Sequence, residues 1–503
     1  MTTFETIFNN PSLPQTKSKR PSDRQKQDGS DLRFHGSAAK ATFLINGNSY
    51  FAELARALRQ ARRTVWIVGW DFNPDIPMEP DKSDETLSDL LHELAAANPQ
   101  LEIRILVWTL GPIYSDKSLR LLRKKSFPRN ERIDLRFDLQ RAVRGCHHQK
   151  LVCIDDAVSF IGGMDLTSRR WDTWLHRAKD KLRRDPEGVS YDPLHDVQAM
   201  VTGDAARLIG DIARRRWENA TGENHLPLAE DVAFSWPDDL AVSMRDIAVS
   251  FALTEPSTAF RPGISDGIAM TLDVIARARR QLYIEAQYLA SFRVADAIAA
   301  RLQEEDGPEV VIICTRSSHG LIEKLVMGGN RDRVIRRLKR ADRADRLRVY
   351  YAVVPGPVTP GENGEVEVLV HSKLIIADDE LVRIGSSNLN NRSEGLDGEC
   401  DMLFEAGSDA HRGAIADLRN HLLSEYLGTT PETFAAALMQ SGTLIEAVDA
   451  LNDGPRGLRE FTVELSGSIS PISGTAIFDP VRPFTVLNRL GLGALVRRLI
   501  RPA

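Results

Sequence analysis

The sequence predicts an α/β protein of two lobes related by a pseudo-twofold axis, each lobe being a mixed β-sheet flanked by helices. Three observations support this fold and place a shared active site at the lobe interface. A phrase of the form H-x-K-x4-D occurs at 148–155 and returns at 371–378. A Gly-rich turn follows each copy at the same interval, as Gly162-Gly163-Met164-Asp165 and as Gly385-Ser386-Ser387-Asn388. The expected strands and helices also alternate in the same order in both parts of the chain, which indicates an α/β duplication.

Length and composition limit the number of domains and the classes of function to be considered. A chain of 503 residues is too long for one ordinary core, so at least two domains are expected. A net charge of -5 weighs mildly against a dedicated nucleic-acid binder. The four cysteines are unevenly spaced and do not form a disulfide framework. No apolar run is long enough to span a bilayer, and the polar stretch 1–36 is not expected to act as an ordinary signal peptide. The sequence leaves open a cytoplasmic location, a peripheral membrane location, and export by another route.

We divide the chain into five parts. These are a flexible polar leader (1–38), a first lobe (39–228), a linker (229–245), a second lobe (246–455) and a C-terminal tail (456–503). The tail ends in an apolar stretch with three Arg at 490–502, which is either a docked helix or a helix on a membrane surface.

In the first lobe, order is expected from position 41. A strand over 41–45 is followed by a helix over 50–63, where apolar residues recur at helical spacing. The β-branched run 64–69 predicts a buried strand. Strands over 101–108 and 133–137 follow, and a fourth strand is expected to carry His148 and Lys150.

The second lobe repeats this order. We expect strands over 247–253, 281–287, 309–314, 347–353 and 368–377, with a helix over 268–280 after the first of them. The Pro- and Gly-rich stretch 355–365 predicts a loop near the substrate entrance. An Arg-rich run at 331–348 is either a solvated helix face or a surface for anionic lipid or substrate phosphate.

The motif spacing pairs an imidazole with an ammonium group. Residues i and i+2 of a strand share one face, so His148 should lie beside Lys150 and His371 beside Lys373. The aspartates that end the motifs, Asp155 and Asp378, fall where the chain must turn. We assign them a structural or hydrogen-bonding role in the motif and not proton transfer.

With its two H-x-K-x4-D phrases, the sequence resembles the phospholipase D superfamily, whose members place two such motifs in one site. Three further stretches resemble the phospholipase branch: Ser168-Arg169-Arg170-Trp171-Asp172, the run 282–288 (LYIEAQY), and Asn391-Arg392-Ser393. The likeness covers most of residues 40–430. It implies the two-lobed fold described above and a glycerophospholipid substrate.

In-line displacement at phosphorus needs a nucleophile on one side and a proton donor on the other. The resemblance implies that His148 attacks to form a phosphohistidine and that His371 acts as acid and then as base. The reverse assignment stays open because the repeats are alike. Two lysines and the Gly-rich turns would hold the non-bridging oxygens, and no cofactor or metal is needed. The catalytic motif residues are His148, Lys150, Asp155, His371, Lys373 and Asp378.

The resemblance also implies an acidic residue that orients each catalytic His. Glu399 is expected to serve His371, and Asp196 matches the corresponding phrase of the lipid-cleaving branch. Ser386 and Asn388 in the second turn are candidate substrate-binding residues. Asp165 in the first turn is expected to be protonated or turned away, because a carboxylate beside a phosphate is unfavourable.

The resulting hypothesis is a phospholipase D-type hydrolase that gives phosphatidic acid, with transfer to other alcohols as a further reaction. It would work as a monomer on a peripheral membrane surface, with nucleic acid not expected as a partner. Cardiolipin synthase-type transfer, a nuclease of the same superfamily and a silent lipid-binding protein remain as alternatives. A zinc site at Cys146, His147, His148 and Cys153 is disfavoured, since adjacent strand residues point opposite ways. Trp171 and Trp174 either line the pocket or pack a lobe.

Overall fold

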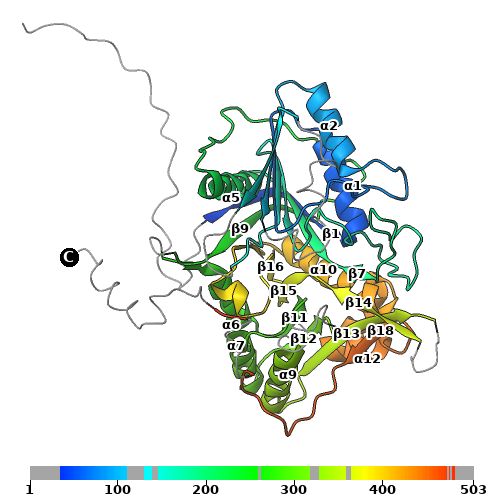
Figure 1. The fold of residues 1–503 in the computed structure, drawn as a ribbon. Helices are drawn as coiled ribbons and strands as arrows, with labels where there is room; N and C mark the ends of the chain where they lie inside the picture. Colours follow the sequence, from blue (N-terminus) through cyan, green and yellow to red (C-terminus); the bar gives the residue numbers. More distant parts are fainter. Residues whose placement is uncertain are drawn as a thin grey trace, which may run out of the picture.

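The computed structural model describes residues 34–109, 130–138, 145–258, 262–317, 328–357, 364–472, 475 and 479–481. Figure 1 shows the first half of the chain above the second, each with strands between layers of helices. The leader up to residue 33 and the stretch 490–502 lie outside the described residues, as does most of the predicted loop at 355–365. Among the described residues, no helix has both the length and the apolar character needed to cross a bilayer.

The first half contains eight strands and three labelled helices among the described residues. They are β1 (Phe34–Ile45), α1 (Asn46–Leu58), β2 (Thr64–Gly69), α2 (Leu87–Ala97), β3 (Glu102–Trp108), β4 (Ile133–Asp138), β5 (Leu151–Ile154), β6 (Val158–Gly162), β7 (Leu194–His195), β8 (Val197–Thr202) and α5 (Asp204–Thr221). Local sequence sets several boundaries. Thr86 and Asp89 form a capping box at the start of α2, and α5 ends at Gly222, which adopts a left-handed backbone.

The second half repeats this series and then extends it. It contains β9 (Met244–Glu255), β10 (Ile264–Ser265), α6 (Asp266–Arg277), β11 (Gln281–Ala286), α7 (Phe292–Gln303), β12 (Glu309–Cys314), α9 (Gly329–Ala341), β13 (Leu347–Pro355), β14 (Glu365–Val370), β15 (Lys373–Ala377), β16 (Leu381–Gly385), η2 (Arg392–Glu394), β17 (Glu399–Glu405), α10 (Asp409–Leu427), α11 (Pro431–Ser441), α12 (Leu444–Leu451) and β18 (Gly457–Glu460). The predicted α/β class is confirmed.

The pairing of strands follows the same path in both halves. Outward from the centre, the first half runs β1, β8, β6, β5, β2, β3, β4. The second half runs β9, β17, β16, β15, β11, β12, β13. The two paths meet where β1 pairs with β9 in antiparallel register, for example Ala38 with Ile247. The two sheets are therefore joined into one, which the sequence analysis did not predict.

The β1–β9 pairing also explains where the first strand begins. β1 starts at Phe34, opposite Phe251 of β9, and not at the predicted position 41. Alternating polar and small residues hid this part of the strand from pattern reading. Its order comes from pairing with a strand far along the chain.

The central strands of each half are the most deeply buried part of the sheet. β2 and β3, and likewise β11 and β12, are parallel pairs with nearly every side chain buried, as expected for strands covered on both faces. One core cluster fills each half separately. A third cluster extends across the junction and includes Trp217 of α5, Phe251 of β9 and Tyr426 of α10. The halves therefore share a core as well as a sheet.

The Arg-rich run lies at the surface, where part of it is bound to another segment of the chain. Most of it forms α9, and three of its guanidinium groups donate to main-chain oxygens of the segment that follows β18. Arg333 bonds Ser470, Arg336 bonds Glu464 and Ser468, and Arg340 bonds Leu465 and Gly467. These arginines hold residues 464–470 against the helix, because carbonyls without strand partners need donors.

Candidate active site

The two motifs occupy equivalent places beside the central strands. His148 and Lys150 come just before β5, and His371 lies between β14 and β15, which Lys373 begins. The expectation that one strand carries both motif residues is therefore wrong in detail. At each histidine the main chain bonds to the other half of the molecule.

The main chain of each histidine is bonded across the junction. The N–H of His148 donates to the carbonyl of Gly398 at 2.8 Å, and the N–H of His371 donates to the carbonyl of His195 at 2.8 Å. The residue after each acceptor is acidic, namely Glu399 and Asp196. This backbone pairing brings a carboxylate from one half to the imidazole of the other.

The side chains of these acidic residues contact the histidine of the opposite half. Nδ1 of His148 lies 3.0 Å from a carboxylate oxygen of Glu399, and Nδ1 of His371 lies 2.7 Å from Asp196. The prediction that Glu399 serves His371 is wrong, because Glu399 contacts His148. Each acidic residue orients the histidine of the opposite half, because segments of the two halves pair there, β7 with β14 and His147 with Gly398.

These contacts fix the tautomer of each ring. Nδ1 of His148 also lies 3.0 Å from the carbonyl oxygen of Ser386, and neither a carbonyl nor a carboxylate can donate. Nδ1 therefore carries the proton. For His371, Lys373 Nζ is 3.2 Å from Nδ1, but the shorter contact to Asp196 assigns the proton in the same way. Nε2 of each ring has no hydrogen-bond partner in the part of the chain that the structure describes.

The pKa values couple the two motifs. Burial, followed by the charges of Lys150 and Lys373, holds the pKa of His148 well below its ordinary value. The pKa of His371 is lowered likewise, first by burial and then by Lys373, Arg170, Lys150 and His148. Each imidazole is therefore within electrostatic reach of the other motif. Burial also raises the pKa of Asp196 to about 6 and that of Glu399 to about 7.

The lysines differ between the halves. Lys150 Nζ lies 3.2 Å from Asp165, whose carboxylate also accepts from the N–H of Trp70 at 2.8 Å. Asp165 is thus turned toward Lys150 and the main chain. Lys373 instead donates to the amide oxygen of Gln287 at 3.1 Å, and burial lowers its pKa to about 7.

The Gly-rich turns adapt to their acidic partners. A Cβ at Gly163 would lie 2.3 Å from an oxygen of Asp196, so only glycine leaves room for this carboxylate. At the equivalent place in the second half, the Ser386 hydroxyl donates to Glu399 at 2.6 Å, and Ser393 donates to its other oxygen at 2.7 Å. The difference between Gly-Gly and Gly-Ser thus follows from how each carboxylate is held.

Asn388 is the counterpart of Asp165 in the second turn. Its N–H donates to Ser393 at 3.1 Å, and its buried side-chain oxygen has no hydrogen-bond partner within the described ranges. The sequence placed Asn388 among the substrate-binding candidates, and it lies in the turn that also holds Ser386.

The motif aspartates lie away from the imidazoles, at the other end of β5 and β15. Asp155 accepts from the main-chain N–H groups of Arg62, Arg63 and Thr64 at 2.6–2.7 Å. Asp378 accepts from the equivalent groups of Arg279, Arg280 and Gln281. Both adopt a left-handed backbone, with φ of 55° and 54°, which Asp tolerates. They tie the hairpin turn to the start of β2 or β11 and do not join the histidines.

Arg170 is a site residue that the sequence analysis did not select. Its charge acts on His371, Asp196 and Lys373, and its guanidinium group donates to the carbonyl of Arg169 at 3.2 Å. The sequence signal was present in the SRRWD phrase, but the phrase alone did not indicate which Arg faces the site.

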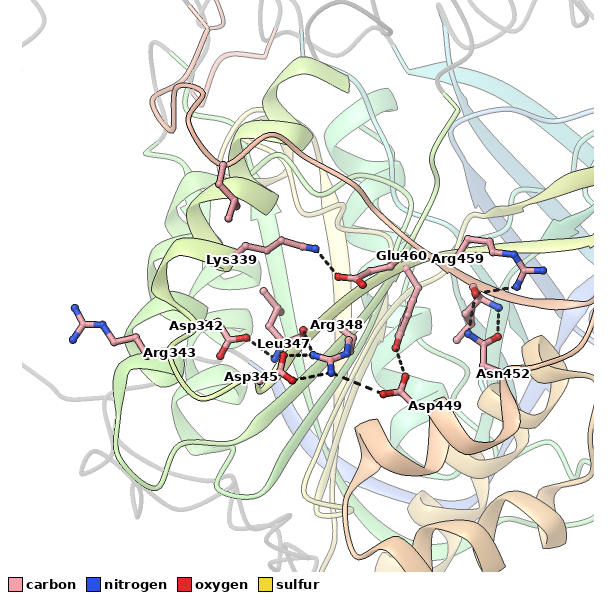
Figure 2. A pocket seen from close by; sticks show the side chains of 13 residues that line it. Lys339, Asp342, Arg343, Asp345, Leu347, Arg348, Asp449, Asn452, Arg459 and Glu460 are labelled. Atoms are coloured by element: carbon pink, nitrogen blue, oxygen red, sulfur yellow. Dashed lines mark hydrogen bonds and ion pairs between the residues drawn. The ribbon is translucent and has the colours of Figure 1, made fainter. Parts of the chain in front are cut away.

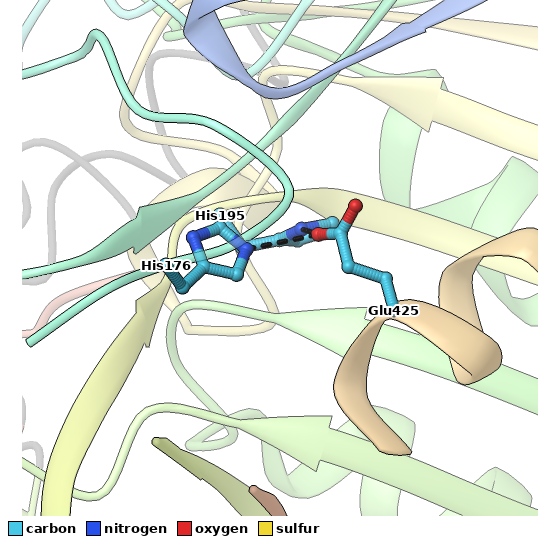
Figure 3. A group of neighbouring side chains, drawn as sticks. All are labelled: His176, His195 and Glu425. Atoms are coloured by element: carbon cyan, nitrogen blue, oxygen red, sulfur yellow. Dashed lines mark hydrogen bonds and ion pairs between the residues drawn. The ribbon is translucent and has the colours of Figure 1, made fainter. Parts of the chain in front are cut away.

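Behind the site lies a buried network that joins the halves. Figure 3 shows the carboxylate of Glu425 reaching both His176 and His195, each at 2.9 Å. The other ring nitrogens contact Asp172 at 2.9 Å and Glu285 at 3.1 Å. Burial alone would lower the pKa of His195, but Glu285 and Glu425 outweigh it and raise the pKa to about 10.

The spacing of these three side chains, all within 4.8 Å, would also suit a metal ion. Asn46 Nδ2, however, donates to both oxygens of Glu425 at 3.0 Å. An amide that donates to both carboxylate oxygens favours a network of ion pairs and hydrogen bonds over a metal site at this position.

A separate groove of about 900 Å³ lies on the second half (Figure 2). Its charges are balanced and largely paired, for example Lys339 with Glu460 at 2.5 Å and Arg348 with Asp345 at 2.7 Å. No motif residue lines it. Size alone therefore does not locate the site.

Comparison with known proteins agrees with this geometry. A family model described as "Phospholipase D" matches residues 57–253, and one described as "Cardiolipin synthase, PLD-like domain" matches 271–417. Phospholipase D alpha 1 of Vigna unguiculata is 24% identical over 536 residues, which cover 78% of this chain and 66% of that protein. Phospholipase D A of Dictyostelium discoideum is 25% identical over 412 residues, covering 71% of this chain and 32% of that protein. The chain thus spans less than two thirds of these relatives.

A solved structure shares the fold. Phosphatidylserine synthase of Haemophilus influenzae Rd KW20 superposes with a TM-score of 0.53 at 14% identity, covering 84% of this chain and 98% of that one. The two family models together cover most of both halves, including both H-x-K-x4-D phrases. The chain belongs to the phospholipase D superfamily.

Proposed function

We propose that this protein is a phospholipase D-type phosphodiesterase that cleaves the headgroup phosphodiester of glycerophospholipids to phosphatidic acid and a free alcohol. The observation that carries the proposal is the crossed pairing of His148 with Glu399 and His371 with Asp196. Each carboxylate binds Nδ1 and leaves Nε2 for phosphorus chemistry, so two oriented imidazoles serve one site.

In the first step, Nε2 of His148 attacks phosphorus and a P–N bond forms. The bound phosphodiester brings negative charge next to His371 and so offsets the lysine and arginine charges that lower the pKa of its ring. The P–O bond to the headgroup alcohol breaks as the protonated His371 ring gives its Nε2 proton to the departing oxygen. Asp196 stabilises the imidazolium of His371 before transfer, and Glu399 stabilises the positive charge that develops on His148. Lys150, Lys373 and Arg170 supply positive charge for the non-bridging oxygens.

In the second step, neutral His371 takes a proton from water, and the hydroxide oxygen attacks phosphorus. The P–N bond breaks, which releases phosphatidic acid and restores neutral His148 and protonated His371. The roles of the two histidines can be exchanged without altering this balance.

The same intermediate can pass the phosphatidyl group to an alcohol in place of water. The match of residues 271–417 to the model described as "Cardiolipin synthase, PLD-like domain" favours testing this reaction. A lipid hydroxyl, such as that of phosphatidylglycerol, would then be the acceptor.

The test is a panel of purified phospholipids incubated with the protein, with and without ethanol or phosphatidylglycerol. We expect phosphatidic acid in water, phosphatidylethanol with ethanol, and loss of both products in His148→Ala and His371→Ala proteins that still fold. Full turnover in either variant would refute the mechanism. Cleavage of labelled DNA in place of lipid would reassign the substrate class.

The intermediate itself can be trapped. Acid quenching during turnover of a phosphate-labelled lipid should leave label on the protein that is labile to acid and stable to base. Its absence from His148→Ala alone, with retention in His371→Ala, would identify His148 as the nucleophile.

A further inference from the structure

The segment between the first motif and β7, residues 170–193, leaves the site and returns to it. We call it the rim loop. It begins at Arg170, whose charge acts on His371. It ends at β7, directly before Asp196, the orienting partner of His371. Both ends of this loop are therefore anchored at the site.

The inner side of the rim loop is fixed by buried charges. Arg183 donates to Asp172 at 3.0 Å and to the carbonyl of Tyr191 at 2.8 Å. Asp185 binds Arg169 at 2.9 Å, and His176 joins the network with Glu425. These contacts give the loop one conformation with a defined outer side.

That outer side is unusually apolar for exposed chain. Trp174 is 55% exposed, Leu182 39% and Val189 51%. Only seven large apolar side chains are exposed among the described residues, and three of them belong to this loop. Such a concentration beside a site marks a contact surface.

The exposed charges between Trp174 and Arg184 are basic. They are Arg177, Lys179, Lys181 and Arg184. Arg184 donates to main-chain carbonyls, and the other three form no ion pair with any described residue. Asp180, half-buried among them, accepts from the N–H of Leu182, while the acidic Glu187 and Asp192 come later in the loop. A basic stretch in a chain of net charge -5 is a local feature.

A groove of about 390 Å³ adjoins the loop. Leu175, Ala178, Val354, Pro355 and Pro357 give it apolar walls, and Arg177, Lys179 and Arg456 give it positive charge. Arg456 also fixes Trp174, because it donates to the Trp174 carbonyl at 2.6 Å and lies 5.9 Å from the ring centre. The apolar and basic features thus form one continuous surface.

We infer that the rim loop and this groove are the face by which the protein rests on a bilayer containing anionic phospholipid. Trp at the interface, shallow apolar side chains and unpaired basic residues are the chemistry of peripheral membrane attachment. The inference deepens the proposed function, because it would bring lipid headgroups to the histidines at the base of the loop.

The experiment measures binding in a protein that cannot turn over. Full-length His148→Ala protein is titrated with phosphatidylcholine vesicles, with and without phosphatidylglycerol. We expect tighter binding with the anionic lipid. Lys179→Gln with Lys181→Gln should weaken it roughly 25-fold, since each basic residue near an anionic surface contributes about a factor of 5. Trp174→Ala should weaken binding to both vesicle types.

Matched controls lie elsewhere on the surface. Arg62→Gln with Arg343→Gln removes two exposed cations, of which Arg343 points away from its neighbours in Figure 2. Met439→Ala removes an 82% exposed apolar side chain. These controls should bind like the parent. Equal weakening by controls, unchanged binding in the loop variants, or no vesicle binding by the parent would overturn the inference.

The two proposals fail separately. A protein that binds vesicles through this loop but cleaves no phospholipid would overturn only the proposed function. One that cleaves phospholipid while loop variants bind normally would overturn only the membrane-contact face.

Discussion

Glu399 lies 3.0 Å from Nδ1 of His148 across a separation of 251 residues along the chain. The equivalent contact of Asp196 with His371 crosses in the opposite direction. Because each half supplies the carboxylate for the imidazole of the other, neither half holds a fully oriented histidine by itself.

Glu399→Gln should act on the first motif, although it lies in the second half. An amide keeps the shape but loses the charge that stabilises an imidazolium, so kcat should fall on the order of 10²-fold. In an NMR titration the pKa of His148 should change, and the pKa of His371 should stay nearly the same. Glu405→Gln, at the exposed end of the same strand, is the control. A shift centred on His371 would contradict the crossed assignment.

Gly163→Ala should disturb the second motif from the first half. The added methyl would overlap the Asp196 carboxylate and push it away from His371. A misplacement of this size costs on the order of 10²-fold in kcat. Gly413→Ala, where a Cβ meets nothing within 4 Å, should leave kcat unchanged. Normal activity in Gly163→Ala would mean that Asp196 has room to move without loss.

Asp155→Ala should reduce stability and not chemistry. Three main-chain N–H groups lose their acceptor, which should lower the free energy of unfolding by about 1–3 kcal/mol. Urea denaturation measures this, and activity well below the unfolding midpoint should remain. Asp155→Asn, which tolerates the left-handed backbone and keeps one oxygen, should lose less. A folded but inactive Asp155→Ala protein would place this residue in the chemistry.

The His195 ring should remain protonated at neutral pH. Its pKa is raised from 6.5 to about 10, so its contribution to stability is complete below pH 6.5 and is lost as the pH rises toward 10. NMR of the ring measures its protonation directly. The pH dependence of total stability would not isolate it, because the lowered pKa of Lys373 makes stability rise with pH over part of the same range. A neutral His195 ring at pH 8 would contradict the ion-pair network.

Chelation provides an independent check of the same cluster. If N–H groups of His176 and His195 bind Glu425 and no metal ion does, EDTA should leave the melting temperature unchanged. A clear drop, reversed by added zinc, would show that the cluster binds metal.

Local pattern was enough to predict much of the fold. The strands at 64–69 and 309–314 were predicted with the bounds that the structure has, because buried parallel strands carry continuous apolar runs. The α/β class followed from the duplicated order of elements. The first seven residues of β1 escaped notice because their order depends on pairing with β9 and not on their own sequence.

The active site was harder to predict from local sequence patterns. The spacing His-x-Lys located the imidazoles, but no local rule reveals which half supplies the carboxylate. Assigning Glu399 to His371 followed proximity in sequence, whereas the main chain of each half bonds to the other half at Gly398 and His195. Arg170 and Glu425 were missed for the same reason, since their importance arises from partners more than a hundred residues away.

The junction between β1 and β9 has an evolutionary consequence. Equivalent strands of two copies meet there in antiparallel register, which is the geometry of a self-complementary dimer interface. An ancestor carrying one copy could have assembled this centre only as a homodimer, with reciprocal donation of the acidic side chain. Joining two such copies in one chain would free each to diverge, which is consistent with aspartate orienting one imidazole and glutamate the other.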